Sequence, residues 1–524
     1  MRKPENWKAC CASGSNMRKK TATVEFGDFQ TPSYLANRVC DLLVAQGLQP
    51  CAIVEPTCGK GSLLLAALER FPTVSRAIGV DINPDYIACL EKHLNRLSYS
   101  GIAEVSVGDF FAVDWERLFS QLPEPILVIG NPPWVTNAEL SALESTNLPH
   151  KTNFQALSGL SAKTGKSNFD ISEWMLIQIL KLKVHKQITV AMLCKTSVAR
   201  KVLAYAWKED LSVKSSRLYR LDAQQVFGAA VDACLLVCHV ADGSSNHLCQ
   251  VYAGLSEDTY ETTFGFRNGL LIADMDYFET WQHLQGEGYY RWRSGIKHDA
   301  AAVMELKPLQ ETYLNKFGES VDVENIYLYP MLKSSEIAHQ NNPVPTRWML
   351  VTQRHISEDT TPISSNAPKT WAYLHKHAAI LDGRKSSIYR NRPRFSMFGI
   401  GEYTFAPWKI AISGLYKKLH FVVIGPYKGK PVVLDDTCSF LPCKSRAEAY
   451  LLETLLNSEV ARQFYSAFIF WDAKRPITID ILNRLDVLAL ARELGEEKHL
   501  LEFVRQDKMT ITSSAQLTIW KVES

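Results

Sequence analysis

The sequence predicts an α/β protein in which a Rossmann-like domain is followed by a mixed α+β domain. Over the first 240 or so residues, short apolar runs alternate with helical patterns, which is typical of a parallel sheet covered by helices. After about residue 245 this alternation gives way to segments rich in Tyr, Trp, Pro and Gly. At 524 residues, the chain is also longer than a single hydrophobic core ordinarily supports. We therefore expect a flexible segment at 1–20, a first domain at 21–245, and a second at 246–524 that ends in a helical part.

The elements of the first domain can be placed in order. Thr31-Pro32 predicts a helix start with Thr31 as the N-cap, and the apolar residues that follow, from Leu35 to Leu43, mark one face of that helix. Apolar runs predict strands at 52–54, 77–80, 102–107, 126–129, 188–193 and 231–240. Helices are predicted at 62–70, around 87–97, at 171–182 and near 447–456.

Composition and charge exclude several classes of protein. No apolar run is long enough to span a bilayer, and the polar start lacks the apolar stretch of a signal peptide, whether Met1 or Met17 is the true start. The twelve cysteines contain no CxxC pair, so neither a disulfide framework nor a zinc site is expected. These features favour a reducing, cytoplasmic compartment and no metal.

Basic residues are concentrated between Arg384 and Lys430, although the net charge is only +3. Ten basic residues and one acid lie there, interleaved with aromatic side chains. Such a stretch can pair with phosphates and stack on bases. The alternative is a solvated basic surface over an aromatic core. The candidates for nucleic-acid contact are Arg390, Arg392, Arg394, Lys409 and Lys417.

Residues 135–168 form a long polar interruption that contains Gly165-Lys166-Ser167. This fragment resembles part of a phosphate-binding loop, but the earlier glycine of that motif is missing and no predicted strand leads into it. We therefore do not expect a nucleoside-triphosphate site.

Polar and glycine residues follow three successive predicted strands. Glu55-Pro56-Thr57-Cys58-Gly59-Lys60-Gly61 follows the first, Asp81-Ile82 the second and Asp109-Phe110 the third. The ends of parallel strands meet at one edge of a sheet, where ligands bind. The glycines allow close approach of backbone to ligand, Asp81 can accept hydrogen bonds from ribose hydroxyls, and Asp109 can accept one from an adenine amino group beside Phe110. A plain tight turn and a helix N-cap are the respective alternatives for the glycine segment and Asp81.

Asn131-Pro132-Pro133-Trp134 directly follows the fourth strand. The two prolines fix the backbone and remove two N–H donors, so that carbonyl groups face the crevice. A rigid turn that ends the strand is the alternative.

In these motifs the sequence resembles the adenine-N6 DNA methyltransferases of restriction–modification type, with cofactor motifs first and the target-recognition domain last. The resemblance covers most of the chain. It implies S-adenosylmethionine as cofactor, bound by Thr31, Glu55, Thr57, Cys58, Gly59, Gly61, Asp81, Ile82, Asp109, Phe110 and Asn131. It implies catalytic roles for Asn131, Pro132, Pro133 and Trp134, with Phe227 packing against a flipped base. Trp292–Asp299 (WRSGIKHD) and Tyr329–Ile337 (YPMLKSSEI) resemble segments of such recognition domains.

One departure concerns the methylated base. The family more often has Tyr where Trp134 stands, and Trp is frequent in relatives that methylate cytosine N4, whereas Asn131 favours adenine. In the expected mechanism the Asn131 side-chain oxygen and the Pro132 carbonyl accept the two hydrogens of the adenine amino group, which localises its lone pair. Trp134 and Phe227 would hold the flipped base by stacking.

The alternatives left open are a cytosine-N4 enzyme, an RNA or protein-glutamine methyltransferase, and a DNA-reading subunit of a phage-defence assembly. The long basic and aromatic second half favours duplex DNA as the partner. No segment with the acidic metal site of a nuclease is evident, so any cognate restriction endonuclease is expected to be a separate protein. We expect the chain to act as a monomer.

Overall fold

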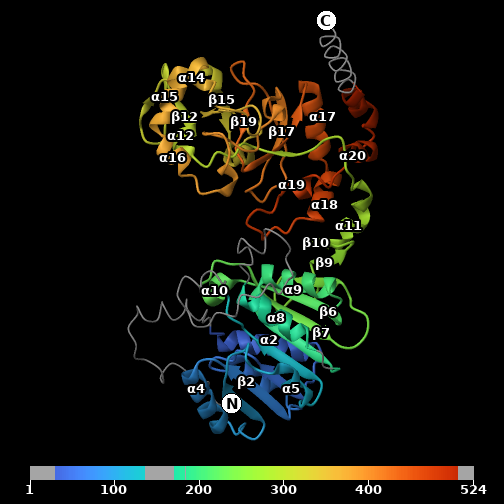
Figure 1. Ribbon diagram of the computed structural model, residues 1–524. Helices are drawn as coiled ribbons and strands as arrows, with labels where there is room; N and C mark the ends of the chain where they lie inside the picture. Colours follow the sequence, from blue (N-terminus) through green and yellow to red (C-terminus); the bar gives the residue numbers. More distant parts are fainter. Residues whose placement is uncertain (1–29, 136–169, 183–184, 506–524) are drawn as a thin grey trace. The chain divides into compact units, whose positions relative to one another are not determined.

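The structure is a computed structural model that describes residues 30–135, 170–182 and 185–505 (Figure 1). The expected flexible segment at 1–20 and the Gly165-Lys166-Ser167 fragment lie outside these residues. The chain divides into two compact units, Met1–Ile272 and Ala273–Ser524. The division falls later than the boundary expected after residue 245, because the strands between 248 and 272 continue the sheet of the first unit.

Among the described residues, the first unit holds a ten-stranded sheet in the order β10-β9-β8-β6-β7-β5-β4-β1-β2-β3. The strands from β1 to β5 run parallel, and β7 is antiparallel to both of its neighbours, β5 and β6. The bounds are β1 Ala52–Glu55, β2 Arg76–Asp81, β3 Ala103–Val107, β4 Ile126–Gly130, β5 Ile188–Lys195, β6 Val213–Leu221, β7 Ala233–Val240, β8 Leu248–Tyr252, β9 Thr262–Arg267 and β10 Leu270–Ile272.

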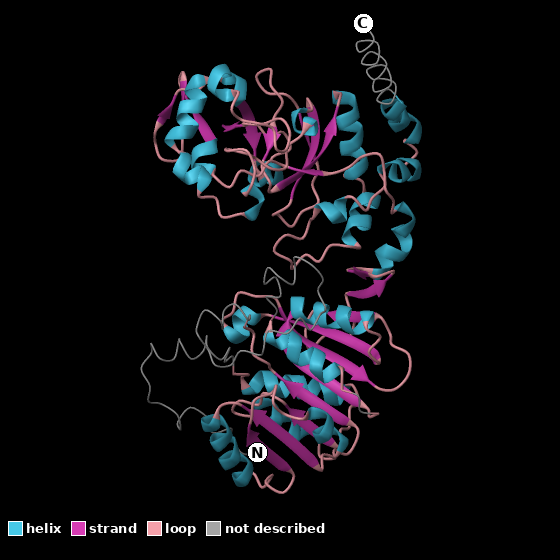
Figure 2. Ribbon diagram, in the orientation of Figure 1, coloured by secondary structure: helices cyan, strands magenta, loops and turns pink. Residues whose placement is uncertain are grey.

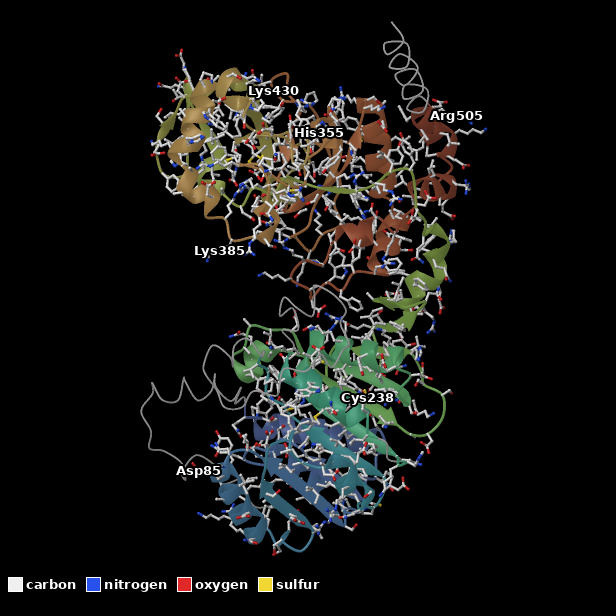
Figure 3. The ribbon with its side chains drawn as sticks, viewed as in Figure 1. Asp85, Cys238, His355, Lys385, Lys430 and Arg505 are labelled. Carbon is white, nitrogen blue, oxygen red and sulfur yellow. The ribbon has the colours of Figure 1, made fainter. Side chains whose placement is uncertain are left out.

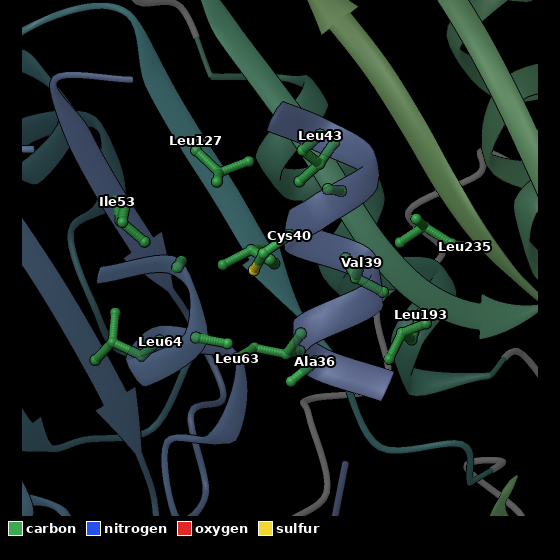
Figure 4. Close-up of a cluster of buried hydrophobic side chains, with 14 of the residues drawn as sticks. Ala36, Val39, Cys40, Leu43, Ile53, Leu63, Leu64, Leu127, Leu193 and Leu235 are labelled. Carbon is green, nitrogen blue, oxygen red and sulfur yellow. The ribbon is translucent and has the colours of Figure 1, made fainter. Parts of the chain in front are cut away.

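Helices cover both faces of this sheet, as Figure 2 shows. They are α2 Ser33–Ala45, α3 Ser62–Arg70, α4 Pro84–Arg96, α5 Trp115–Ser120, α8 Ile171–Leu180, α9 Thr196–Lys208 and α10 Ala223–Phe227. Side chains of α2 and α3 pack on β4, β5 and β7 in the main core, where Cys40, Leu63 and Leu127 lie close together (Figure 4). The helix α2 begins at Ser33, and Pro32 rather than Thr31 is its N-cap, so the predicted cap was wrong. The Thr31 hydroxyl instead accepts a hydrogen bond from the side-chain amide nitrogen of Asn131.

The described part of the second unit contains one antiparallel sheet and one mixed sheet. One has the order β11-β20-β17-β18 and the other β14-β13-β12-β16-β15-β19. The strands are β11 Arg293–Ser294, β12 Glu305–Leu309, β13 Thr312–Leu314, β14 Ser320–Val321, β15 Leu328–Leu332, β16 Arg347–Leu350, β17 Trp408–Ser413, β18 Val422–Ile424, β19 Val433–Leu434 and β20 Cys438–Cys443. The helices are α11 Met275–Trp281, α12 Ala301–Met304, α13 Ser334–His339, α14 Ile363–Asn366, α15 Pro368–Lys376, α16 Ala378–Asp382, α17 Arg446–Leu456, α18 Glu459–Ser466, α19 Ile479–Leu482 and α20 Val487–Glu493.

The segments 292–299 and 329–337, which the sequence singled out without a physical reason, meet at the seam of these two sheets. The first contains β11, which pairs with β20, and its Ile296 forms a bridge with Asp435. The second contains β15, which pairs with β19, and the Ser334 hydroxyl donates to the Thr437 carbonyl (2.6 Å). A Cβ on Gly295 would lie 2.1 Å from the Asp435 carbonyl oxygen, so the close backbone approach requires glycine. Both segments therefore hold the chain where it passes from one sheet to the other.

No helix within the described ranges is long and apolar enough to cross a bilayer. Over the same residues, no group of three or more His, Cys, Asp or Glu side chains is arranged to hold a metal ion.

Candidate active site at the carboxyl edge of the first sheet

The turn after β1 is shaped by two carboxylates. Glu55 is buried, and its carboxylate accepts a hydrogen bond from the backbone N–H of Leu64 (2.9 Å) in the first turn of α3. Burial raises the pKa of this carboxyl well above its usual range. Asp81 accepts a hydrogen bond from the backbone N–H of Gly59 (2.7 Å), which fixes the turn against the end of β2. The turn is therefore a built element at the edge of the sheet.

The two glycines of this turn have different surroundings. Both have left-handed backbone angles, with φ of +51° at Gly59 and +80° at Gly61. Gly59 lines the pocket described below. A Cβ on Gly61 would lie 2.3 Å from the Leu90 side chain, so this glycine is needed for packing against α4. The structure thus gives Gly61 a packing role, and its expected approach to the cofactor stays a prediction.

Acidic and aromatic side chains follow β2 and β3, as predicted. Asp81 also accepts a hydrogen bond from the backbone N–H of Asn83 (2.9 Å). The N-cap of α4 is Asn83, so the alternative reading of Asp81 as that cap is wrong. Asp109 accepts from the backbone N–H of Phe111 (3.0 Å), and the Phe111 ring stacks on Trp174 with centroids 4.5 Å apart.

These residues surround an open pocket. Of the residues predicted to bind cofactor, it brings together Thr31, Glu55, Thr57, Cys58, Gly59, Asp81, Ile82, Asp109, Phe110 and Asn131. The pocket is also lined by residues that were not among the predicted cofactor ligands, which are Gln30, Pro56, Ser62, Leu63, Asn83, Tyr86, Gly108, Phe111, Val135, Ile171 and Met175. Most of them adjoin a predicted residue, but Ile171 and Met175 come from α8, whose contact with the pocket has no local sequence signal.

The tetrapeptide after β4 lies at the wall of the pocket. Among the described residues the lining includes Asn131 and Pro133, but not Pro132, Trp134 or Phe227. The Asn131 amide nitrogen donates to the Thr31 hydroxyl (3.3 Å), which orients the side chain. Trp134 stands where the family that the sequence resembles more often has tyrosine. In this structure Trp134 is buried, with only 4% of its surface exposed.

The rings of Trp134 and Phe227, which the resemblance assigns to holding a flipped base, contact each other in an edge-to-face geometry. Their centroids are 5.0 Å apart and their planes meet at 74°. The Trp134 indole N–H donates to the Leu193 carbonyl (3.3 Å). Stacking of a base on Trp134 would therefore require the two rings to separate from the arrangement seen here.

The pocket has the chemistry of a nucleoside site. Asp81 and Asp109 present acceptors for hydroxyl and amino groups, and Phe110 and Phe111 present apolar rings. The Thr57 hydroxyl lines the pocket and is buried without a hydrogen-bond partner among the described residues. A buried hydroxyl that faces a pocket in this way fits a polar ligand group.

The basic residues predicted to contact nucleic acid differ in exposure. Arg390 and Lys417 are exposed, as is Lys385 of the same segment, which is labelled in Figure 3. Arg394 is exposed but forms an ion pair with Asp382 (2.7 Å). Arg392 is also exposed and donates to the Ser357 hydroxyl. Part of the basic stretch is therefore available at the surface of the second unit.

The prediction that Lys409 contacts nucleic acid was wrong. Lys409 lies in β17, which has β18 on one side and β20 on the other, and only 1% of it is exposed. Its ammonium group donates to the Ala406 carbonyl (2.6 Å), and burial lowers its pKa to about 7. A residue in this position cannot contact DNA. The sequence placed it in a basic surface because neighbouring positions are basic, whereas the sheet turns it inward.

The strand order β3-β2-β1-β4-β5-β7-β6 with an antiparallel β7, and a nucleoside-type pocket at the carboxyl ends, define the class I S-adenosylmethionine-dependent methyltransferase fold. No protein-family model matches the chain. The type II methyltransferase M.NspV of Nostoc sp. is 46% identical over 470 residues, which cover 90% of this chain and 98% of that protein. The chain belongs to this family, the type II DNA methyltransferases of restriction–modification systems. Its methyl donor is S-adenosylmethionine, as the sequence predicted.

Two solved structures show partial likeness. The type IIL restriction–modification enzyme MmeI in complex with DNA is 13% identical with a TM-score of 0.49, covering 90% of this chain and 67% of that chain. A Listeria monocytogenes protein assigned to the class I S-adenosylmethionine-dependent methyltransferases is 16% identical with a TM-score of 0.31, covering 46% and 71%. The family assignment rests on the Nostoc relative and not on these structures.

Proposed function

We propose that this enzyme methylates the exocyclic N6 amino group of adenine at a specific site in duplex DNA. The observation that carries the proposal is the position of Asn131, which follows the central strand β4 and lines the same pocket as Asp81 and Asp109. The Asn131 amide, which would accept a hydrogen bond from the target amino group, thus adjoins the site proposed for the cofactor.

The cofactor is proposed to bind in this pocket. Asp81 would accept hydrogen bonds from its ribose hydroxyls, and Asp109 from its adenine amino group. Phe110 and Phe111 would pack against the adenine, and the Thr57 hydroxyl would gain a polar partner. When bound, S-adenosylmethionine supplies a methyl group already activated by its sulfonium.

The adenine amino nitrogen is a weak nucleophile because its lone pair is delocalised into the ring. The Asn131 amide nitrogen is directed to Thr31, so its oxygen is the atom that accepts a hydrogen of the amino group. The Pro132 carbonyl accepts the other hydrogen. These two acceptors localise the lone pair on nitrogen and stabilise the positive charge that develops there.

The target base must leave the duplex to reach this wall of the pocket. We propose that Trp134 and Phe227, which contact each other in the structure, separate and hold the flipped base. The second unit is proposed to read the DNA site, with Arg390, Arg392, Arg394 and Lys417 as contacts. The chain would act as a cytoplasmic monomer, with any cognate endonuclease a separate protein.

Single-molecule sequencing of DNA from a methylation-free host that expresses the chain tests the proposal. N6-methyladenine at one recurring short sequence is the expected result. No modified base, from protein that folds and binds S-adenosylmethionine, would contradict it. Purified protein with DNA and a divalent metal should give no specific cleavage, and specific cutting would overturn the proposal of a separate nuclease.

Cytosine N4 is the second candidate target, and the identity of Trp134 favours it, since tryptophan is frequent in cytosine-N4 relatives. The same sequencing experiment distinguishes the two. N4-methylcytosine would retain the mechanism, because cytosine also presents an exocyclic amino group, but would overturn our interpretation of Asn131.

A further inference from the structure

The carboxyl end of β5 holds the end of the Asn131-Trp134 tetrapeptide at two points. The Leu193 carbonyl accepts the hydrogen bond from the Trp134 indole (3.3 Å). Two residues further along the strand, the Lys195 ammonium group donates to the Trp134 main-chain carbonyl (2.9 Å). Both the side chain and the backbone of Trp134 are therefore fixed by one strand.

The same ammonium group links the tetrapeptide to α8. Lys195 forms an ion pair with Asp170 (2.7 Å), whose carboxylate is only 6% exposed. Asp170 is the N-cap of α8, where it accepts a hydrogen bond from the backbone N–H of Ser172 (3.1 Å). Lys195 thus bridges a buried helix cap and the tetrapeptide.

A backbone hydrogen bond runs beside this bridge. The N–H of Ile171, the first residue of α8, donates to the Val135 carbonyl (3.0 Å), and both residues line the pocket. Residues 134–135 and 170–171 therefore lie next to each other in space, and the Lys195 ammonium group contacts both segments.

Fixing Trp134 also fixes Asn131. Pro132 and Pro133 lie between them, and their rings hold two successive φ angles near one value. A stiff tetrapeptide anchored at β4 on one side and at Lys195 on the other leaves the Asn131 side chain little freedom. Transfer to a weak nucleophile depends on such alignment, and a misplacement of about 1 Å costs on the order of a hundredfold in rate.

We infer that Lys195 is a positioning residue for methyl transfer, which holds the tetrapeptide in register through the Trp134 carbonyl and is itself held by Asp170. The inference rests on the proposed function only in taking Asn131-Trp134 as the place of transfer. It does not depend on which base is methylated.

The chain offers a matched control. Lys201 of α9 pairs with Glu173 of α8 (3.0 Å), and that carboxylate is 1% exposed. Lys201→Met and Lys195→Met each remove an ammonium group from a buried carboxylate on α8, so a purely structural role predicts similar losses for both. Of these two lysines, Lys195 is the one that contacts the tetrapeptide, through the Trp134 carbonyl.

The experiment measures total transfer of labelled methyl groups from S-adenosylmethionine to DNA by the full-length protein, together with thermal melting. For Lys195→Met we expect kcat to fall about 10- to 100-fold, with KM for S-adenosylmethionine within about threefold of wild type. Lys201→Met should lower the melting temperature similarly and keep kcat within about twofold of wild type. Asp170→Asn, which retains an oxygen for the helix cap, should reduce kcat less than Lys195→Met does.

A kcat for Lys195→Met equal to that of Lys201→Met would overturn the inference. If Lys195→Met does not fold, Asp170→Asn decides in its place, and a kcat unchanged from wild type would count against a positioning role. Mass spectrometry of the wild-type product identifies the methylated base separately. A wild-type product other than N6-methyladenine would contradict the proposed function while leaving the comparison of the variants decisive for Lys195.

Discussion

The pocket of the first unit and the basic stretch of the second unit differ in how well the sequence predicted which residues would share one site or one surface. In the pocket, ten of the residues predicted to bind cofactor line one cavity, although they come from segments as distant as Thr31 and Asn131. In the basic stretch, five neighbouring candidates divide between exposed Arg390 and Lys417, engaged Arg392 and Arg394, and buried Lys409.

The difference teaches that position relative to a parallel sheet is stronger evidence than local composition. The residue after each parallel strand must emerge at the same edge, whatever its neighbours are. In the second unit, whether a basic residue is exposed or buried depends on tertiary packing, which the neighbouring residues in the sequence do not reveal. Four predictions test this contrast.

Asn131→Ala should have the largest effect. Removal of the acceptor for the amino hydrogens should lower kcat by at least about a hundredfold, and affinity for S-adenosylmethionine should change little. Methyl transfer to DNA and equilibrium binding of the cofactor measure the two quantities. Asn95→Ala, at an exposed position of α4, serves as the control. Substantial activity in Asn131→Ala would remove the mechanism.

Asp81→Asn should mainly weaken cofactor binding. Loss of the negative charge weakens the expected bonds to the ribose hydroxyls, so KM for S-adenosylmethionine should rise about tenfold while kcat changes by less than about threefold. Asp85→Asn is the matched control, because that carboxylate is exposed four residues later in the first turn of α4 (Figure 3). Equal effects from the two variants would show that the pocket does not use Asp81.

Arg390→Ala and Lys417→Ala should each weaken DNA binding by a smaller amount. A lost phosphate contact should reduce the slope of log affinity against log salt by about 1 for each variant. Binding measured over a series of salt concentrations gives this slope. Arg492→Ala removes an exposed arginine that pairs with Glu497 and is the control. Unchanged slopes for both variants would place the DNA contacts elsewhere.

Lys409→Met should leave DNA affinity within about twofold of wild type, because a buried side chain makes no phosphate contact. Its effect should be on stability. The pKa of about 7 in the folded protein lies below the ordinary value near 10.5, so between these pH values the unfolded chain binds more protons and stability rises with pH. The variant should lose that part of the rise between pH 7 and pH 10, measured by thermal melting. A large loss of DNA affinity in a folded variant would restore Lys409 as a contact.

Much of the first unit was predictable from the sequence because buried strands and amphipathic helices carry local patterns. The helix at 62–70 was predicted with the bounds of α3, and the strand at 126–129 differs from β4 by one residue. The strand β6 was not predicted, because its sequence (VKSSRLYRL) mixes charged and apolar residues without a uniform run. The extent of the sheet beyond residue 245 was also missed, since short strands such as β10 depend on pairing with their neighbours.

The sequence by itself determined the order of the motifs that follow the parallel strands. It also determined the types of side chain that line the pocket and the presence of the Asn-Pro-Pro-Trp tetrapeptide. These are local features, and the regular geometry of a parallel sheet converts them into a site. Only the tertiary structure decided that Gly61 packs on Leu90, that Lys409 is internal, and that Lys195 joins the Trp134 carbonyl to Asp170. Each of these depends on contacts between residues distant in sequence or on which face of a strand is covered, and burial of that kind is set by the packed chain as a whole.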